Sequence, residues 1–245
     1  MESRVIADLD TLAAVNRALP AAGDPAIAAH SKTFFKSEPG GYGEGDRFLG
    51  IRVPVVRRLA LRARGLSLDK TKKLLESPYH EARLMALVML NEHYSKGDAS
   101  VRDEIYRFYL ASTARINNWD LVDASAHRIV GAHLEARSRK PLDRLARSTL
   151  VWDRRVAVIA TYRFIQNGEV EPTFALAGRL LADEHDLIHK AVGWMLREAG
   201  KRGPKELDEF LEAHAAMMPR TMLRYAIEKL STTKRARFMK MRGRR

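Results

Sequence analysis

One helical pattern recurs along this chain at a regular distance, and it constrains the fold more than any other feature. Within each copy, apolar residues stand three and four apart, which is the spacing of an amphipathic helix rather than of a strand. The copies come into register when one basic residue of each is superimposed, and that residue recurs after 72, 35 and 34 positions. The superimposed residues are Arg83 of HEARLMALVML, Arg155 of WDRRVAVIATY, Lys190 of HDLIHKAVGWML and Arg224 of TMLRYAIEKL.

A period of about 35 residues with two helices in each unit is typical of helical solenoids. The consensus of tetratricopeptide repeats is absent, which favours repeats of the HEAT kind. Prolines stand where several of the helices are expected to begin, a place where the missing N–H costs no intrahelical hydrogen bond. We therefore expect an all-α, HEAT-like solenoid. The longest irregular stretch, residues 37–50, carries five glycines but no phosphate-loop motif, so we expect a mobile connection there.

The recurring basic residues suggest a polyanionic partner. The chain holds 43 Lys and Arg against 30 Asp and Glu, a net charge of +13, and seven of the basic residues lie within the last twelve positions. Stacked repeats place equivalent positions on one face, so Arg83, Arg155, Lys190 and Arg224 are expected to form a stripe along a concave, DNA-binding surface. Arg154, beside Arg155, is expected to contribute. The alternative is that these cations are solvated helix charges with no partner.

Other classes of protein are excluded by composition. The chain has no cysteine, which removes disulfides, iron–sulfur ligation, thiol nucleophiles and cysteine-based zinc fingers. Its first residues lack the apolar core of a secretory signal, and its longest purely apolar run, residues 84–90, is far short of a membrane span. We expect a soluble, cytoplasmic protein with no membrane association.

The copy near residue 119 departs from the pattern. It carries Trp119, Asp120 and Asp123 where the neighbouring copies carry Arg or Lys. Trp119 and Asp123 are four residues apart and so share one helix face. A carboxylate beside an indole is unfavourable for gripping phosphate and suits developing positive charge instead. The alternative is that Asp120 caps a helix and Trp119 fills the core.

Two further features have a functional and a structural interpretation. Trp194 lies four residues after Lys190 and therefore shares its helix face, whereas Trp152 is equally suited to the core. His185 and His189 have the spacing of a zinc-binding pair, but no third ligand is evident. We therefore expect neither a metal nor another cofactor.

Four segments of the chain resemble, in sequence and in order, the AlkD-type alkylpurine DNA glycosylases. These are HEAT-like-repeat enzymes that act on N3- and N7-alkylated purines in double-stranded DNA. The resemblance runs from about residue 30 to residue 230. The segments are FLGIRVPVVRRLA (48–60), NNWDLVD (117–123), VWDRRVAVIA (151–160) and HKAVGWMLREAGK (189–201).

The resemblance implies roles for four residues. Asp123 corresponds to the catalytic aspartate, and Trp119 and Trp194 correspond to the two active-site tryptophans. Arg155 corresponds to the arginine that contacts the DNA backbone. All four are present, whereas some relatives with the same fold lack the catalytic set. The resemblance also implies that the lesion is engaged through its backbone and sugar, without a deep base pocket.

The residues suit this chemistry. Alkylation at N3 or N7 makes a purine cationic and already a good leaving group, so no general acid is needed. One carboxylate is then enough to stabilise the oxocarbenium-like sugar and to orient water, without a metal or cofactor. The indoles can pack their electron-rich faces against the charged sugar.

The last twelve residues are expected to stand apart from the repeats. We expect one HEAT-like domain over residues 1–233 and a basic tail over residues 234–245, mobile in solution and attracting DNA through charge. The alternative is that Phe238 and Met239 dock this segment as a closing helix. Two other functions stay open: a non-catalytic HEAT-like DNA-binding protein and a HEAT-type protein scaffold. We expect a monomer with no obligate protein partner.

Overall fold

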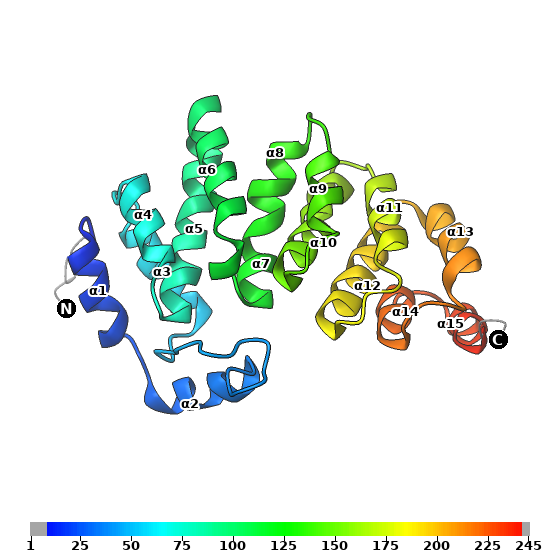
Figure 1. The fold of residues 1–245 in the computed structure, drawn as a ribbon, viewed down its shortest axis with the longest axis horizontal. Coiled ribbons are helices and arrows are strands. Elements are labelled where there is room, and N and C mark those ends of the chain that lie inside the picture. Colours follow the sequence, from blue (N-terminus) through cyan, green and yellow to red (C-terminus); the bar gives the residue numbers. More distant parts are fainter. Residues whose placement is uncertain (1–8, 242–245) are drawn as a thin grey trace, which may run out of the picture. The chain divides into compact units, whose positions relative to one another are not determined.

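The computed structural model describes residues 9–241, and in that range the helices are joined by turns and loops, with no strand (Figure 1). The prediction of an all-α, HEAT-like repeat fold is confirmed. The chain divides into two compact units, and the boundary along the sequence follows Ser125, in the last turn of α7. The helices of the first unit are α1 (Leu12–Ala21), α2 (Pro25–Phe34), α3 (Val53–Arg62), α4 (Leu68–Leu75), α5 (His80–Lys96), α6 (Ala99–Ala111), the 3₁₀ turn η1 (Thr113–Arg115) and α7 (Trp119–Ala126). Those of the second are the π-helical turn η2 (His127–Gly131), α8 (Ala132–Leu134), α9 (Lys140–Leu145), α10 (Val151–Gln166), α11 (Glu171–Arg179), α12 (Asp186–Gly200), α13 (Pro204–His214), α14 (Arg220–Ile227) and α15 (Thr232–Lys240).

The first unit is built around α5, which packs against α3, α4 and α6. The first half of this helix is buried on every side, including the charged residues Glu81 and Arg83. Some helices of the unit are capped by side chains: the side chain of Thr11 accepts from Ala14 N at the start of α1, and Asp98 accepts from Val101 N at the start of α6. Because α5 is surrounded, its charged side chains must find partners inside the unit.

The glycine-rich connection (residues 37–50) was expected to be mobile, but hydrogen bonds hold its C-terminal end, at residues 49–51, in place. The buried carboxylate of Glu81 accepts hydrogen bonds from the backbone N–H groups of Leu49, Gly50 and Ile51, at 3.0, 2.8 and 3.2 Å. Gly50 has a φ of 78°, and a Cβ there would lie 2.0 Å from the carbonyl oxygen of Asp24. Only glycine fits this position.

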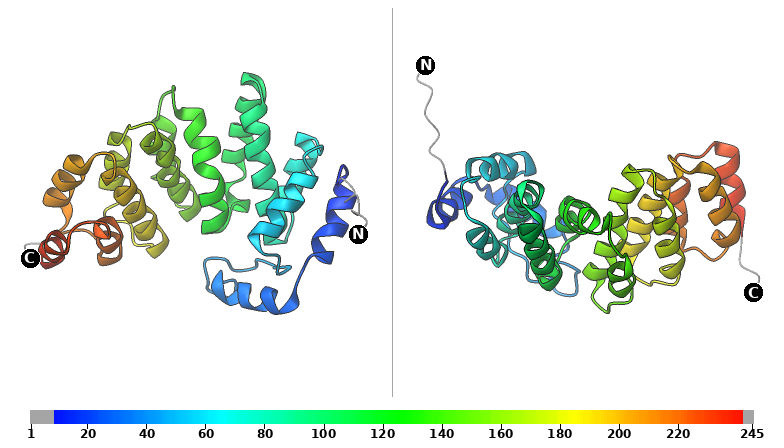
Figure 2. Two further views of the ribbon diagram at one scale, coloured as in Figure 1. Left: turned by 180° about the vertical axis from the view of Figure 1, so that it is seen from behind. Right: turned by 90° about the horizontal axis from the view of Figure 1, so that it is seen from above.

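In the second unit, α10, α12 and α14 lie side by side, as Figure 1 and Figure 2 both show, and α11 and α13 pack against them. The backbones of α12 and α14 approach closely at Gly193. A Cβ on this glycine would lie 2.5 Å from both the carbonyl oxygen of Met222 and Cβ of Tyr225. The absence of a side chain at Gly193 therefore sets the distance between these two helices.

The basic C-terminal segment is a helix, so the expectation of a mobile tail is wrong for its described part. Helix α15 begins at Thr232 and is capped by Ser231, so the predicted boundary between residues 233 and 234 falls inside it. Phe238 is only 1% exposed, and Lys234 and Arg237 form ion pairs with Asp208 and Glu212 of α13. Residues 242–245 of the predicted tail lie outside the described range. The alternative of a closing helix is the one that the structure supports.

Across residues 9–241, no helix combines the length and the apolar character that crossing a membrane requires.

Candidate functional site

Positions counted from the first residue of each helix show which residues are equivalent, and the sequence pattern predicted these equivalences only approximately. Asp123, Arg155, Lys190 and Arg224 are each the fifth residue of their helices, α7, α10, α12 and α14. Arg83 is the fourth residue of α5, one place out of this register. Asp123 thus occupies the position at which three other helices carry a cation.

Trp119 belongs to an aromatic cluster in the first unit. Its ring centroid lies 5.9 Å from that of Phe34, in an edge-on arrangement, and 5.6 Å from that of Phe35. Phe34 is 55% exposed and Trp119 is half-buried, so the cluster opens to solvent. The interpretation of Trp119 as an ordinary core residue is therefore incomplete, because part of its ring faces a partly exposed aromatic surface.

Asp123 lies one turn further along α7 and is half-buried. It stands close to the fully buried phenol of Tyr109, whose hydroxyl lies 2.8 Å from Ser125 Oγ. Burial raises the pKa of Tyr109 first, and the negative charge of Asp123 raises it further, against the hydrogen bond to Ser125. Tyr109 therefore stays protonated beside the aspartate.

Asp120 enters a buried charge network instead of capping its helix. Its Oδ2 lies 2.8 Å from His80 Nε2, and the other ring nitrogen of His80 lies 3.2 Å from Asp46 Oδ2. Asp46 Oδ1 also accepts from Arg83 Nη2 at 2.7 Å and from Asn117 Nδ2 at 2.8 Å. This network joins the glycine-rich connection, α5 and the start of α7.

The network corrects the prediction for Arg83. The side chain is buried, and it also donates to the carbonyl oxygen of Ser77 and to Asn117 Oδ1. Its pKa is lowered by burial, against the opposing charge of Asp46. Its hydrogen bonds hold the unit together, and the guanidinium is not on the surface where DNA would meet it.

His80 carries the charge that the two aspartates require. Although burial lowers its pKa, the charge of Asp120 and the hydrogen bonds to Asp120 and Asp46 raise the pKa of His80 to about 9. The pKa of Asp46 is lowered: burial opposes this, but the bond to His80 and the charge of Arg83 outweigh it. At neutral pH His80 is therefore an imidazolium between two carboxylates.

The two arginines of α10 also differ from the expected exposed stripe. Arg155 is 4% exposed, and its Nη1 donates to the carbonyl oxygen of Leu187 at 2.6 Å, which ties α10 to α12. Arg154 is paired with Asp183, with Nε 2.6 Å from Oδ2, and its Nη1 donates to the carbonyl oxygens of Ser148 and Thr149. Both contacts stabilise the second unit.

The remaining cations of the register are accessible. Lys190 forms an ion pair with Asp186 at 2.8 Å, one turn earlier, and its side chain is 43% exposed. The bond to Lys190 lowers the pKa of Asp186. Arg224 is exposed on α14. Arg57, the fifth residue of α3, is also exposed, and the superposition of sequence segments missed it.

Trp194 is half-buried on α12, and its ring packs against a ring of α10. Its ring centroid lies 6.3 Å from that of Tyr162, and the ring of Tyr162 meets His127 edge-on at 5.5 Å. Trp152, in contrast, is 4% exposed and belongs to the core. Tyr162 and His127 could not be recognised from the sequence, because their rings line up with Trp194 only when α10, α12 and η2 pack together.

The histidine pair at the start of α12 forms local contacts. His185 Nδ1 accepts from Leu187 N at 3.1 Å, and the ring of His189 contacts the carbonyl oxygen of Asp183. Within residues 9–241, no group of three or more His, Asp or Glu side chains is arranged to hold a metal ion.

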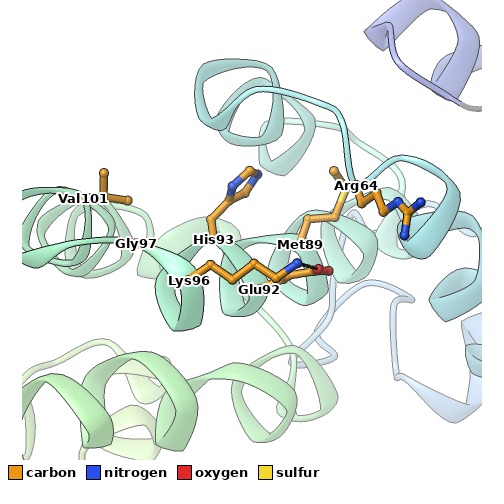
Figure 3. A pocket seen from close by; sticks show the side chains of 7 residues that line it. All are labelled: Arg64, Met89, Glu92, His93, Lys96, Gly97 and Val101. Atoms are coloured by element: carbon orange, nitrogen blue, oxygen red, sulfur yellow. Dashed lines mark hydrogen bonds and ion pairs between the residues drawn. The ribbon is translucent and has the colours of Figure 1, made fainter.

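A separate cavity of about 260 Å³ lies at the C-terminal end of α5 (Figure 3). Glu92 and Lys96 form an ion pair on its wall, and burial lowers the pKa of His93. None of the predicted site residues lines this cavity.

Most of the chain matches a known protein family. Residues 15–230 match the model of a family described as DNA alkylation repair enzyme. The chain belongs to this family. No curated protein sequence matches the chain.

Solved structures of similar proteins agree with the fold of the DNA alkylation repair family. A predicted DNA alkylation repair enzyme from Enterococcus faecalis is 17% identical, with a TM-score of 0.66, and the match covers 86% of this chain and 97% of that one. AlkD2 from Streptococcus mutans is 15% identical, with a TM-score of 0.52, over 90% of this chain and 98% of that one. At these identities the likeness shows a shared fold.

Proposed function

We propose that this protein is a monofunctional DNA glycosylase that releases N3- and N7-alkylated purines from double-stranded DNA. Membership of the DNA alkylation repair family gives the general process. The observation that carries the finer assignment is Asp123, a half-buried carboxylate at the helix position where α10, α12 and α14 carry cations. Binding of a polyanion alone gives no reason for a negative charge at this position.

In the proposed reaction, Asp123 stabilises positive charge on the deoxyribose. The bond between C1′ and the alkylated purine breaks, its electron pair neutralises the cationic base, and water adds to C1′ with loss of a proton. Asp123 faces the developing sugar cation and orients the water. The protonated Tyr109 behind it adds no competing charge.

Trp119 and Trp194 are proposed to contact the sugar and backbone of the lesion. Trp119 is backed by Phe34 and Phe35, and Trp194 is backed by Tyr162. These neighbours restrict the rotamers of the two indoles, so little side-chain entropy is lost when the substrate binds. Electron-rich ring faces also suit a positively charged sugar.

We assign backbone phosphate contacts to the accessible cations Arg57, Lys190 and Arg224. The contact between Arg155 and the DNA backbone that the resemblance implies stays a prediction, as do the concave shape of the binding face, the monomeric state and the cytoplasmic location. Arg83 is withdrawn from the DNA-contacting set because it is buried with Asp46.

Release of free base from methylated duplex DNA tests the proposal. We expect 7-methylguanine or 3-methyladenine in the supernatant and abasic sites in intact strands, because a monofunctional enzyme does not cut the backbone. Binding of the duplex without base release would support the non-catalytic DNA-binding alternative. Absence of both binding and release would support the protein scaffold.

A further inference from the structure

His80 lies where three segments of the first unit meet. It is the first residue of α5, its side chain is 3% exposed, and its two ring nitrogens face Asp46 and Asp120 at 3.2 and 2.8 Å. Asp46 belongs to the glycine-rich connection, and Asp120 is the second residue of α7. One imidazole therefore bridges segments that are 34 and 40 residues away along the chain.

The protonation state of this imidazole follows from its partners. An ionised carboxylate only accepts hydrogen bonds, so each ring nitrogen of His80 must donate, which requires the imidazolium form. Arg83 is the other cation of the network, so Arg83 and His80 balance the two negative charges of Asp46 and Asp120. Loss of the proton from His80 would leave an uncompensated negative charge in a buried site.

Two separate contacts link His80 to Trp119. Through Asp120, the imidazole holds the residue that directly follows Trp119 in α7. Through ring packing, it lies 4.7 Å from Phe35, which in turn lies 5.6 Å from Trp119. Phe48 packs on the imidazole at 5.0 Å. Backbone and ring of Trp119 are therefore both restrained by the same side chain.

Asp120 depends on this contact. Its Oδ1 is buried and has no hydrogen-bond partner among the described residues, whereas its Oδ2 meets His80. If the imidazole moved or lost its charge, the carboxylate of Asp120 would have to turn toward solvent. Because Asp120 lies in the first turn of α7, that movement would reorient Trp119 and shift Asp123 one turn later.

We propose that His80 is a positioning residue for the glycosylase reaction, which holds the first turn of α7 so that Trp119 and Asp123 face the sugar together. The inference rests on the proposed function, because it assigns the two residues of α7 to the reaction. His80 itself touches neither substrate nor reacting atoms in this role. It acts through Asp120 and Phe35.

The position of Trp119 can be tested without DNA. The charged groups around His80 are Asp46 from the connection, Asp120 from α7 and Arg83 from α5. In protein labelled with 5-fluorotryptophan, the ¹⁹F resonance of Trp119, assigned by its loss in Trp119→Phe, should shift with a midpoint near pH 9. Asp120→Asn should lower that midpoint, since it removes the charge that raises the pKa of His80. The resonance of buried Trp152 should not follow this transition.

Variants then connect the position of Trp119 to the reaction. His80→Gln should abolish the pH transition, leave the Trp119 resonance displaced at neutral pH and slow single-turnover base release by about tenfold or more. His93→Gln, at the other end of the same helix, is the matched control and should leave both unchanged. A Trp119 resonance that does not respond near pH 9, or that still responds in His80→Gln, would overturn the inference.

Activity separates the two proposals. Wild-type protein that releases no base would refute the glycosylase, and the ¹⁹F transition would still show whether His80 positions Trp119. Wild-type base release with an unaltered rate in a folded His80→Gln would refute the positioning role and leave the glycosylase standing.

Discussion

Arg83 and Asp46 form an ion pair inside the first unit, with Nη2 2.7 Å from Oδ1 and both side chains less than 5% exposed. The pair joins α5 to the glycine-rich connection, which lies 37 residues earlier in the chain. A cation that the repeat pattern places on a DNA-binding face is thus part of the interior. This distinction can be measured.

Arg83→Met should lower the free energy of unfolding by about 3–5 kcal/mol, because it leaves Asp46 with one charged partner fewer in a buried site. It should not change the dependence of DNA affinity on salt. Arg57→Ala, the matched exposed position, should leave the free energy of unfolding unchanged and reduce the slope of log K against log salt by about 0.9. Urea unfolding and DNA titrations at several salt concentrations check both. An altered slope in folded Arg83→Met would contradict the buried assignment.

Asp123→Asn should keep the fold and the affinity for DNA while base release falls by about 10² or more, because a neutral amide of the same shape does not stabilise the sugar cation. Single-turnover release of methylated purines measures this. Asp120→Asn is unsuitable as a control, since Asp120 is bound to His80. Asp143→Asn, at a half-exposed ion pair with Arg179, is better suited. Comparable rates for Asp123→Asn and wild type would refute the catalytic assignment.

Protonation of His80 should make folding depend on pH. Its pKa is about 9 in the folded protein against 6.5 for an ordinary histidine, so the folded state holds one proton more between these values. This contribution is fully present below pH 6.5 and is lost as the pH rises to about 9. The loss amounts to about 3 kcal/mol. Urea midpoints across this range should fall in wild type and stay nearly level in His80→Gln, and an equal fall in both would contradict the assignment.

Phe238→Ala should destabilise the second unit, because Phe238 is the buried residue of α15 and its removal leaves a cavity. We expect a cost of about 3 kcal/mol and a lower thermal midpoint. Arg235→Ala, on the same helix but exposed, should leave the midpoint unchanged. Equal thermal midpoints for Phe238→Ala and wild type would show that the helix does not close the unit.

Gly193→Ala should force α12 and α14 apart, since its Cβ would meet the carbonyl oxygen of Met222 at 2.5 Å. Trp194 follows directly in the chain, so base release should fall together with thermal stability. Gly178→Ala in α11 is the control, because nothing lies within 4 Å of its added Cβ. That substitution should stabilise by about 0.5–1 kcal/mol. Unchanged base release and stability in Gly193→Ala would refute the close-approach role.

Local patterns were sufficient to predict the helices that carry the candidate site residues. The three- and four-residue spacing predicted α5, α10 and α12, and the four-residue separation of Trp119 and Asp123 placed both on one helix. Whether each basic side chain is buried or exposed was not predictable from these patterns. Arg83 is buried because Asp46 is its partner inside the unit. Asp46 lies in an irregular segment, so no sequence periodicity predicts that contact.

Aromatic neighbours of the two tryptophans and one exposed arginine were also not predicted from the sequence. Phe34 and Tyr162 pack against the two tryptophans only in the folded units, and they stand far from them in the sequence. Arg57 was missed because it lies only 26 residues before Arg83, well short of the period of about 35 on which the superposition relied. For α15, the density of positive charge suggested a mobile tail, but Lys234 and Arg237 pair with Asp208 and Glu212 of α13.

The docking of α15 also bears on how the protein would find a rare lesion. A loose cationic arm extends the capture radius of a DNA-binding protein and can transfer it between distant segments of duplex. Here Lys234 and Arg237 are committed to carboxylates of their own unit, so the formal charge of this segment exceeds the charge it presents to solvent. With its described part folded, the segment would not extend as such an arm. Non-specific attraction to DNA would then depend on the exposed cations of the folded units, and it would weaken as the salt concentration rises.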